Sequence, residues 1–189
     1  ENQVSESVHT YKLDQPFFVL ATQNPIEYEG TYTLPEAQLD RFMIKVTIGY
    51  PDKASEVQIL DLYKERKPLE ELEPIADAQD IIDLQRACRE VTVVPEINQY
   101  IVNLAEATRN SRLLNLGMST RAALSLQKIA QASALINGRN YVIPDDVKNN
   151  VALVLSHRLT LSSEARANNF TIEKIIDNLL QYVPAPKVN

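Results

Sequence analysis

Two different hydrophobic patterns meet near Pro51, and they constrain the fold of this chain more than any other feature. Before Pro51, the apolar runs 17–22 and 42–49 have the length and the β-branched and aromatic content of buried strands. After Pro51, apolar residues recur at three- and four-residue intervals, which is typical of helices that bury one face. We therefore expect an α/β part over residues 1–50, followed by an all-α helical bundle over residues 51–189.

The two parts differ in whether they can fold alone. Two strands are too few for an independently stable sheet, so we interpret residues 1–50 as the remnant of a larger α/β layer. The bundle is long enough to bury its own core. The chain begins without an initiator Met, and we expect it to be a fragment or a processed piece. Its first 16 residues alternate weakly and are predicted to form a hairpin or an extended arm.

Periodicity and capping signals predict a series of helices. The stretch 119–138 is apolar almost all round, so we expect a central, buried helix that ends at the C-cap signal Asn137-Gly138. Another helix starts at Pro144 with two acids, but Ile143 stands where a capping Ser or Thr would add about 1 kcal/mol. The predicted helices cover residues 35–41, 52–66, 78–91, 95–110, 119–138, 144–159 and 171–182.

Composition excludes several classes of function. The net charge of -6 argues against a nucleic-acid partner, because phosphate binding needs clustered Lys and Arg. No apolar run approaches the ~18 residues of a membrane-spanning helix, and no secretory signal opens the chain. The single Cys88 excludes a disulfide framework and a Cys-rich zinc site, and His9 and His157 lack metal-ligand spacing. A cytoplasmic, reducing location fits this pattern.

The glycines exclude a phosphate-binding loop within this chain. The loop G-x-x-x-x-G-K-[ST] needs two glycines five residues apart and a Lys after the second. A G-x-G-x-x-G pattern is also absent. The chain holds four glycines, none of which can supply either loop: Gly30, Gly49, Gly117 and Gly138.

Asn24 and Arg41 are candidates for contact with a phosphate. Asn24 directly follows the strand predicted at 17–22, and ligands of open α/β sheets bind beyond the carboxyl ends of strands. The alternative is that Asn24-Pro25 simply begins a turn. Arg41 lies on the short helix predicted at 35–41 and can reach a phosphate of a neighbouring molecule, or can form a salt bridge with Asp40 or Glu36.

Arg121 is the third candidate. It lies in the first turn of the helix predicted at 119–138, after Gly117 and the capping candidates Ser119 and Thr120. Free backbone N–H groups and the helix dipole attract anions there, so Arg121 suits an anion sensor. An ion pair between helices is the alternative.

Other polar residues are interpreted as structural. Arg109 and Arg112 are assigned this role, as is the pair His157-Arg158, whose charge offsets a helix dipole. Cys88 lies on an apolar face and is expected to be inert. The sequence does not assign a role to the loop residues Glu27, Tyr28 and Glu29.

Two long blocks of the sequence resemble one family. The blocks "FFVLATQNPIEYEGTYTLPEAQLDRF" and "GMSTRAALSLQKIAQASALINGRNYVIPDDVKNNVALVLSHRL" are similar to the C-terminal part of a MoxR-type AAA+ ATPase. The resemblance runs over nearly the whole chain, with the blocks in the expected order.

The resemblance implies ATP hydrolysis at a site shared between subunits of a homo-oligomeric ring, usually a hexamer. Asn24 matches sensor 1, which positions the attacking water, and Arg41 matches the arginine finger that enters the neighbour's site. Arg121 matches sensor 2, by which the helical lid senses bound nucleotide. The first residues match a hairpin inserted before sensor 1, residues 1–50 the C-terminal part of the nucleotide-binding core, and residues 51–189 the lid.

The resemblance also implies what this chain lacks. The Walker A and Walker B segments of the family are absent, so the chain alone is expected to be inactive, and ATP and Mg²⁺ require the missing N-terminal segment. The whole protein is expected to remodel or assemble a client or adaptor protein, in the manner of a chaperone. Two alternatives stay open: a non-enzymatic helical interaction module, and a magnesium-chelatase-like motor subunit.

Overall fold

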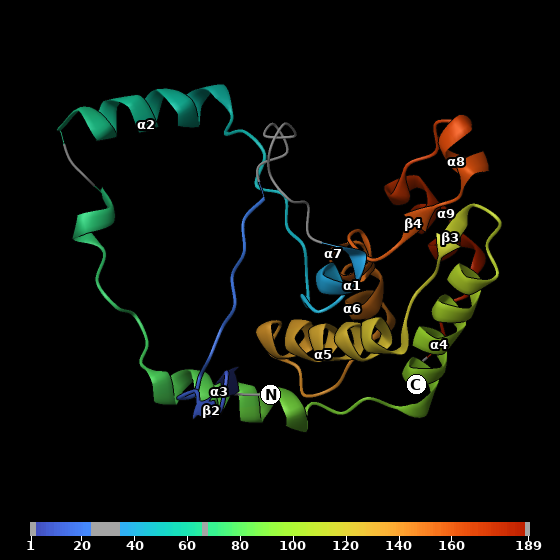
Figure 1. Cartoon of the computed structure of the whole chain (residues 1–189), viewed down its shortest axis with the longest axis horizontal. Coiled ribbons are helices and arrows are strands. Elements are labelled where there is room, and N and C mark those ends of the chain that lie inside the picture. The colour runs from blue at the N-terminus through green and yellow to red at the C-terminus, as the bar shows by residue number, and fades with distance from the viewer. Residues whose placement is uncertain (1–2, 24–34, 66–67, 188–189) are drawn as a thin grey trace. The chain divides into compact units, whose positions relative to one another are not determined.

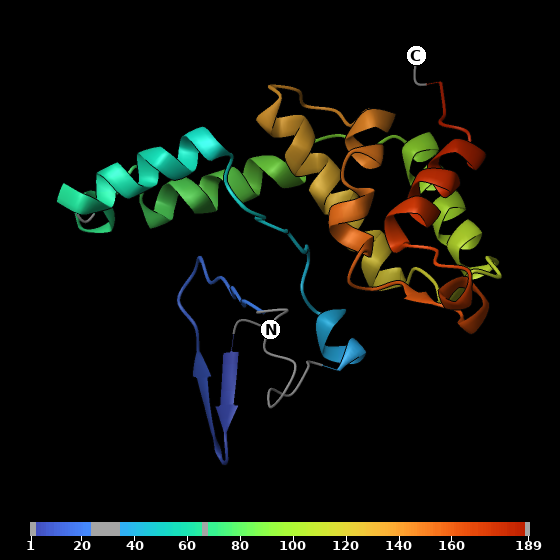
Figure 2. The ribbon, with the colours of Figure 1, turned by 90° about the horizontal axis from the view of Figure 1, so that it is seen from above.

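The chain opens with a β-hairpin, as its weak alternation predicts. The computed structural model describes residues 3–23, 35–65 and 68–187. Strand β1 (Gln3–Glu6) pairs antiparallel with β2 (His9–Lys12), with Gln3 opposite Lys12 (Figure 2). Ser7 takes a positive φ of 53° in the tight turn between the strands. Every residue of both strands is exposed, so the hairpin lacks a core of its own.

The chain divides into two compact units. The first contains Glu1–Leu20 and Val46–Leu84, and the second contains Ala21–Lys45 and Gln85–Asn189. The first unit holds the hairpin, helix α2 (Lys53–Glu65), the 3-10 turn η1 (Pro68–Glu71) and the beginning of α3 (Ala78–Glu90). The boundary expected near residue 50 separates the remnant of a larger α/β layer from the helical bundle. The division into these two units does not test it, so it stays a prediction.

The second unit is a helical bundle around two long helices, α4 (Pro95–Arg109) and α5 (Thr120–Ile136) (Figure 1). A small antiparallel sheet pairs β3 (Leu114–Leu116) with β4 (Thr160–Leu161). The shorter helices are α1 (Glu36–Leu39), α6 (Pro144–Lys148), α7 (Val151–Leu155), α8 (Ser163–Ala167) and α9 (Ile172–Tyr182).

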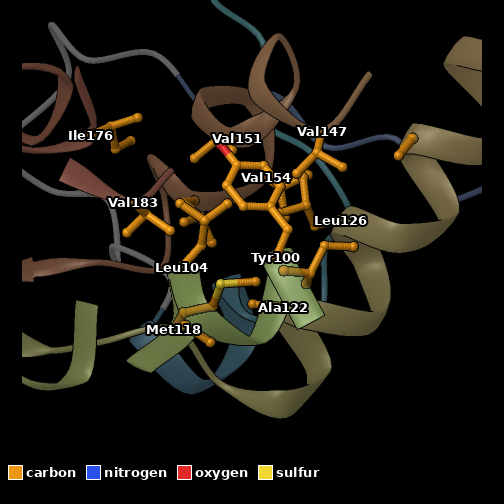
Figure 3. Packing of buried hydrophobic residues seen from close by; sticks show 14 of the residues in the cluster. Tyr100, Leu104, Met118, Ala122, Leu126, Val147, Val151, Val154, Ile176 and Val183 are labelled. Atoms are coloured by element: carbon orange, nitrogen blue, oxygen red, sulfur yellow. The ribbon is translucent and has the colours of Figure 1, made fainter. Parts of the chain in front are cut away.

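The core lies between α4, α5 and the shorter helices of this bundle. Helix α4 buries Ile97, Tyr100, Ile101 and Leu104, which recur at the spacing of one helical face. Figure 3 shows the Tyr100 ring amid side chains from other helices, including Val147, Val151, Val154 and Leu126. Aliphatic side chains from segments distant in sequence thus pack around one aromatic ring, and this burial stabilises the bundle.

The expectation that the helix at 119–138 is buried all round is wrong. The small residues of α5, such as Ala122 and Ala130, are fully buried, which allows neighbouring helices to approach closely. Leu124 and Ile136 on the same helix are exposed, so α5 buries one face and is not buried all round. It ends at Asn137, followed by Gly138 with a φ of 70°, as the C-cap signal predicts.

The prediction of strands at 17–22 and 42–49 is wrong, because neither segment is a strand in the structure. A strand forms only when a neighbour accepts and donates its backbone hydrogen bonds. In the described part of the chain, the sheets pair only β1 with β2 and β3 with β4. The apolar side chains Phe18, Leu20 and Ile48 are exposed, as expected for segments without a sheet around them.

The helix predicted at 144–159 is also wrong as a single element, because it is divided into α6 and α7 at Asn149-Asn150. The Asn150 side-chain amide donates to the carbonyl of Asp146 at 2.8 Å. Asn side chains compete with the helical backbone for hydrogen bonds, which explains why the helix is interrupted here.

Candidate functional site

The structure describes two of the three candidate phosphate contacts. Arg41 and Arg121 lie in the described residues of the second unit. Asn24 lies outside the described residues, as do Glu27, Tyr28 and Glu29.

Arg41 follows the single-turn helix α1. Pro35 precedes this helix, and the Arg41 backbone N–H donates to the carbonyl of Gln38 at 3.1 Å, which closes the turn. The Arg41 side chain is exposed. Among the described residues no ion pair of Arg41 is recorded, whereas both acids predicted as its salt-bridge partners bind other groups. The guanidinium of Arg41 is therefore presented to solvent.

Arg121 lies in the first turn of α5, as predicted. The Ser119 hydroxyl caps the helix by accepting from the Ala122 N–H at 3.1 Å. Arg121 Nη1 lies 3.0 Å from Asp40 Oδ2, and the Arg121 side chain is 61% exposed. The interhelical ion pair that the sequence left open thus exists, and its partner is the residue beside Arg41.

The start of α5 is fixed by the end of α4. Arg109 Nε donates to the Met118 carbonyl at 2.8 Å, and the Met118 N–H donates to Thr108 Oγ1 at 2.8 Å. A Cβ added to Gly117 would lie 2.8 Å from the backbone of Arg109, so this loop requires glycine. Arg109 is therefore structural, as predicted, and it positions the turn that carries Arg121.

Asp40 binds more than one arginine. Its Oδ1 accepts from Arg158 Nε at 3.0 Å and from the Ser119 hydroxyl at 3.2 Å, while Oδ2 accepts from Arg121. The Arg158 side chain is only 2% exposed, in contrast to that of Arg121. A buried guanidinium needs a charged partner and full hydrogen bonding, and Asp40 supplies the charge.

Arg158 also binds the backbone on both sides of Arg41. Its Nη2 donates to the carbonyls of Asp40 at 3.1 Å and Phe42 at 2.6 Å. Its Nη1 donates to the carbonyls of Met43 at 3.1 Å and Val154 at 2.7 Å. Burial lowers the pKa of Arg158, and the charge and hydrogen bond of Asp40 oppose that effect. These contacts agree with the prediction that Arg158 is structural. Its charged partner is Asp40, which is distant in sequence, whereas the prediction named the helix dipole.

His157 lies on the same contact. Its Nε2 is 3.0 Å from the Phe42 carbonyl, so this nitrogen carries the proton in the neutral ring. Burial lowers the pKa of His157, and the positive charges of Arg158 and Lys45 lower it further. The ring also lines a cavity of about 370 Å³ together with Glu36, Lys45 and Arg166.

Asp40 and Arg158 are the groups whose connection the sequence did not predict. The sequence predicts Asp40 only as a salt-bridge partner of Arg41. Asp40 and Arg158 are 118 positions apart, and no local pattern in either segment indicates the other as its partner.

The part of the chain that the structure describes offers neither a metal site nor a membrane span. It contains no group of three or more His, Cys, Asp or Glu placed to hold a metal ion. None of its helices is long and apolar enough to cross a membrane.

Comparison with known proteins identifies the family. The family model described as "ATPase family associated with various cellular activities (AAA)" matches residues 1–44, and the model described as "AAA lid domain" matches residues 106–179. The chain is 44% identical to the uncharacterised protein YeaC of Bacillus subtilis, over 98% of this chain and 58% of YeaC. It is 38% identical to the chaperone MoxR1 of Mycobacterium tuberculosis, over 100% of this chain and 52% of MoxR1. The chain belongs to the MoxR-type AAA+ ATPases.

A solved structure agrees with this MoxR-type assignment. A crystal structure of a provisionally assigned ATPase from Cytophaga hutchinsonii superposes with a TM-score of 0.90 and 37% identity, over 98% of this chain and 59% of that one. The present chain thus spans between half and three fifths of the length of these proteins.

This MoxR-type chain exposes cationic side chains but has no loop that would cradle a triphosphate. Exposed guanidinium groups such as Arg41 and Arg121 suit contact with phosphate oxygens. The sequence has no phosphate-binding loop to cradle a triphosphate and its Mg²⁺. The exposed arginines therefore fit contact with an anion, while a cradle for a triphosphate would have to come from outside this chain.

Proposed function

We propose that this chain is the sensor-1-to-lid part of a ring-forming ATPase, usually a hexamer, that hydrolyses ATP to remodel or assemble a client or adaptor protein. Residues 1–50 complete a nucleotide-binding core, and residues 51–189 form its lid. The observation that supports the proposal is the placement of two exposed arginines in a MoxR-type chain, where Arg121 binds Asp40 and Arg41 is the next residue. As part of this proposal, the protein works in the cytoplasm, which its single cysteine favours.

The three candidate residues have distinct roles in this proposal. Asn24 orients the attacking water, Arg121 binds nucleotide held by its own subunit, and Arg41 enters the site of the neighbouring subunit. In phosphoryl transfer, negative charge spreads over the transferred group, so a fixed guanidinium stabilises the transition state more than the ground state. Mg²⁺, when bound, would neutralise phosphate charge in the cradle that lies outside this chain.

The proposal is tested in a longer protein that joins this chain to a phosphate-binding loop. Arg41→Ala should lower kcat by about 10³-fold or more, which is the lower end for a finger that acts from another subunit. The affinity for ATP should change little, because the finger acts in the transition state. Arg112→Ala, which removes another exposed arginine of the same unit, is the matched control. An unchanged kcat in Arg41→Ala would remove the basis of this proposal.

A helical interaction module without nucleotide chemistry is the competing function. It is favoured by the exposed apolar side chains of α2, among them Val57, Leu60 and Tyr63, which suit contact with another protein. If the longer protein neither bound ATP nor released phosphate, even with all three candidate residues intact, the module would explain the chain better. Calorimetric titration with ATP and Mg²⁺, run beside an assay of phosphate release, separates the two functions.

A further inference from the structure

One carboxylate connects the two arginines to which the proposed function gives different nucleotide sites. Asp40 Oδ2 is bound to Arg121, and the next residue along the chain is Arg41. Because adjacent residues share a peptide unit, a shift of the Asp40 backbone also displaces Arg41. The contact therefore attaches Arg121 to the residue directly before Arg41.

The fixed partner of Asp40 is Arg158. Its buried guanidinium holds Asp40 and the carbonyls of Phe42 and Met43, so the backbone is fixed on both sides of Arg41. The same segment has further attachments to the bundle. The Lys45 N–H donates to the Leu153 carbonyl at 2.9 Å, and the Thr160 hydroxyl donates to Glu36 Oε1 at 3.0 Å.

Helix α1 could not hold Arg41 in place by itself. It contains four residues, it buries none of them, and a single helical turn is unstable in water. The position of Arg41 is therefore set by the contacts of residues 36–45 with the bundle. These contacts include those with Leu153 in α7 and with Thr160 in β4.

The other partner of Asp40 can be exchanged. Arg121 reaches Asp40 through one recorded hydrogen bond, and most of its side chain is in solvent. Ion pairs exposed to this degree are weak and compete with other anions. The pair with Arg158 is buried and has the additional carbonyl contacts, so the Arg121 contact can break while the Arg158 contact stays.

We propose that Asp40 and Arg158 are positioning residues for Arg41, and that the Asp40–Arg121 ion pair couples the position of Arg41 to the partner that Arg121 binds. When Arg121 turns to an anion, Asp40 keeps Arg158 and loses Arg121, and the segment 36–45 is held less tightly. The effect of this coupling on catalysis rests on the proposed function. The attachment of residues 36–45 to the bundle, here called the tether, does not.

Hydrogen exchange in the 189-residue chain tests the tether without any activity assay. The reporters are the amides of Phe42 and Lys45, which donate to the carbonyls of Leu39 and Leu153. Asp40→Asn should speed their exchange by about tenfold or more, because it weakens a hydrogen bond to a charged group. Amides in the middle of α4 and α5 should exchange as before. Asp145→Asn, which alters an exposed aspartate of the same bundle, should leave all of these rates unchanged.

Two further variants keep this test decisive. Arg121→Ala removes an exposed side chain, so the fold should remain, and exchange at Phe42 and Lys45 should rise about two- to fivefold, the range for a weak exposed pair. Arg158→Lys keeps the charge but not the planar fork, so exchange at Phe42 and Lys45 should rise in this variant too. Unchanged exchange at both reporters in Arg121→Ala would contradict the coupling. Unchanged exchange in Asp40→Asn or in Arg158→Lys would contradict the tether.

Activity in the longer protein separates this inference from the proposed function. Asp40→Asn should lower kcat and leave the KM for ATP nearly unchanged, because a displaced Arg41 affects the transition state in the neighbouring site. If Arg41→Ala itself had no effect, the proposed function would fail, while the exchange data would still decide on the tether. If Arg41→Ala abolished hydrolysis but Asp40→Asn left kcat unchanged, the positioning role would be wrong and the proposed function would stand.

Discussion

The carboxylate of Asp146 binds the guanidinium of Arg139 through two hydrogen bonds, from Nη1 to Oδ2 at 2.7 Å and from Nη2 to Oδ1 at 2.6 Å. Oδ2 also accepts from the Ile143 N–H at 2.9 Å. The acid in the first turn of α6 thus satisfies the backbone donor at its start. This contact stabilises the end of the helix where the sequence predicts a weak cap at Ile143.

Asp146 makes the stability of the bundle sensitive to acid. Burial alone would raise its pKa, but the hydrogen bonds from Arg139 and Ile143 outweigh burial, so the pKa is lowered from 3.8. A carboxylate with a lowered pKa in the folded state stabilises the protein above its unfolded pKa and loses that contribution as the pH falls. The expected result is a melting temperature that falls on acidification below about pH 4. Asp146→Asn should melt lower at pH 7 and show a smaller acid-dependent fall, and equal falls in both proteins would contradict this.

His157 gives a second pH dependence, with the neutral ring favoured in the fold. Burial lowers its pKa, the charges of Arg158 and Lys45 add to this effect, and the Phe42 carbonyl and Asp40 oppose it. The folded protein therefore binds fewer protons at this site than the unfolded chain, and stability should fall as the pH drops below about 6.5. His157→Gln removes the titration and keeps a side-chain N–H donor. Thermal melts from pH 8 to 5 should show a steeper loss in the original protein, and parallel losses would exclude a role for His157.

Gly117 is required by a close contact at the start of α5. A methyl group there would lie 2.8 Å from the Arg109 backbone, so Gly117→Ala must displace the chain between Arg109 and Met118. Overpacking of this kind typically costs about 1–3 kcal/mol. Denaturant titration provides the measurement.

Gly138 serves as the control for this prediction. It has a positive φ of 70° and nothing within 4 Å of an added Cβ, so Gly138→Asn meets no clash and keeps a residue that tolerates this conformation. Gly117→Ala should lower the free energy of unfolding more than Gly138→Asn does. The opposite order would show that the loop before α5 can relax.

The sequence predicted most helices of the bundle because their information is local. The apolar spacing of Ile97, Ile101 and Leu104 identifies the buried face of α4, and Ser119 and Gly138 mark the ends of α5. The break at Asn149-Asn150 was missed because strong apolar spacing continued across it. Local signals therefore give the existence of helices more securely than their continuity.

The candidate site depends on information that local patterns do not contain. Asp40 and Arg158 are 118 positions apart, and nothing in either segment specifies the other as its partner. The apolar runs at 17–22 and 42–49 have strand character, but strands require neighbours that local sequence does not provide. The roles of Asn24, Arg41 and Arg121 thus stay proposals based on family resemblance, and for the two arginines also on their placement.

The most direct test of the central claim is a mixing experiment with the longer protein. One variant carries Arg41→Ala, and the second lacks the lysine of the phosphate-binding loop, so each should be inactive alone. In a mixed ring, an intact loop in one subunit can meet an intact Arg41 from its neighbour, and ATPase activity should return in the mixture. A finger that acts between subunits is worth about 10³–10⁵ in rate, so even partial pairing is measurable. If subunits exchange but activity stays at the level of the separate variants, Arg41 does not act in the neighbouring site and the account is contradicted.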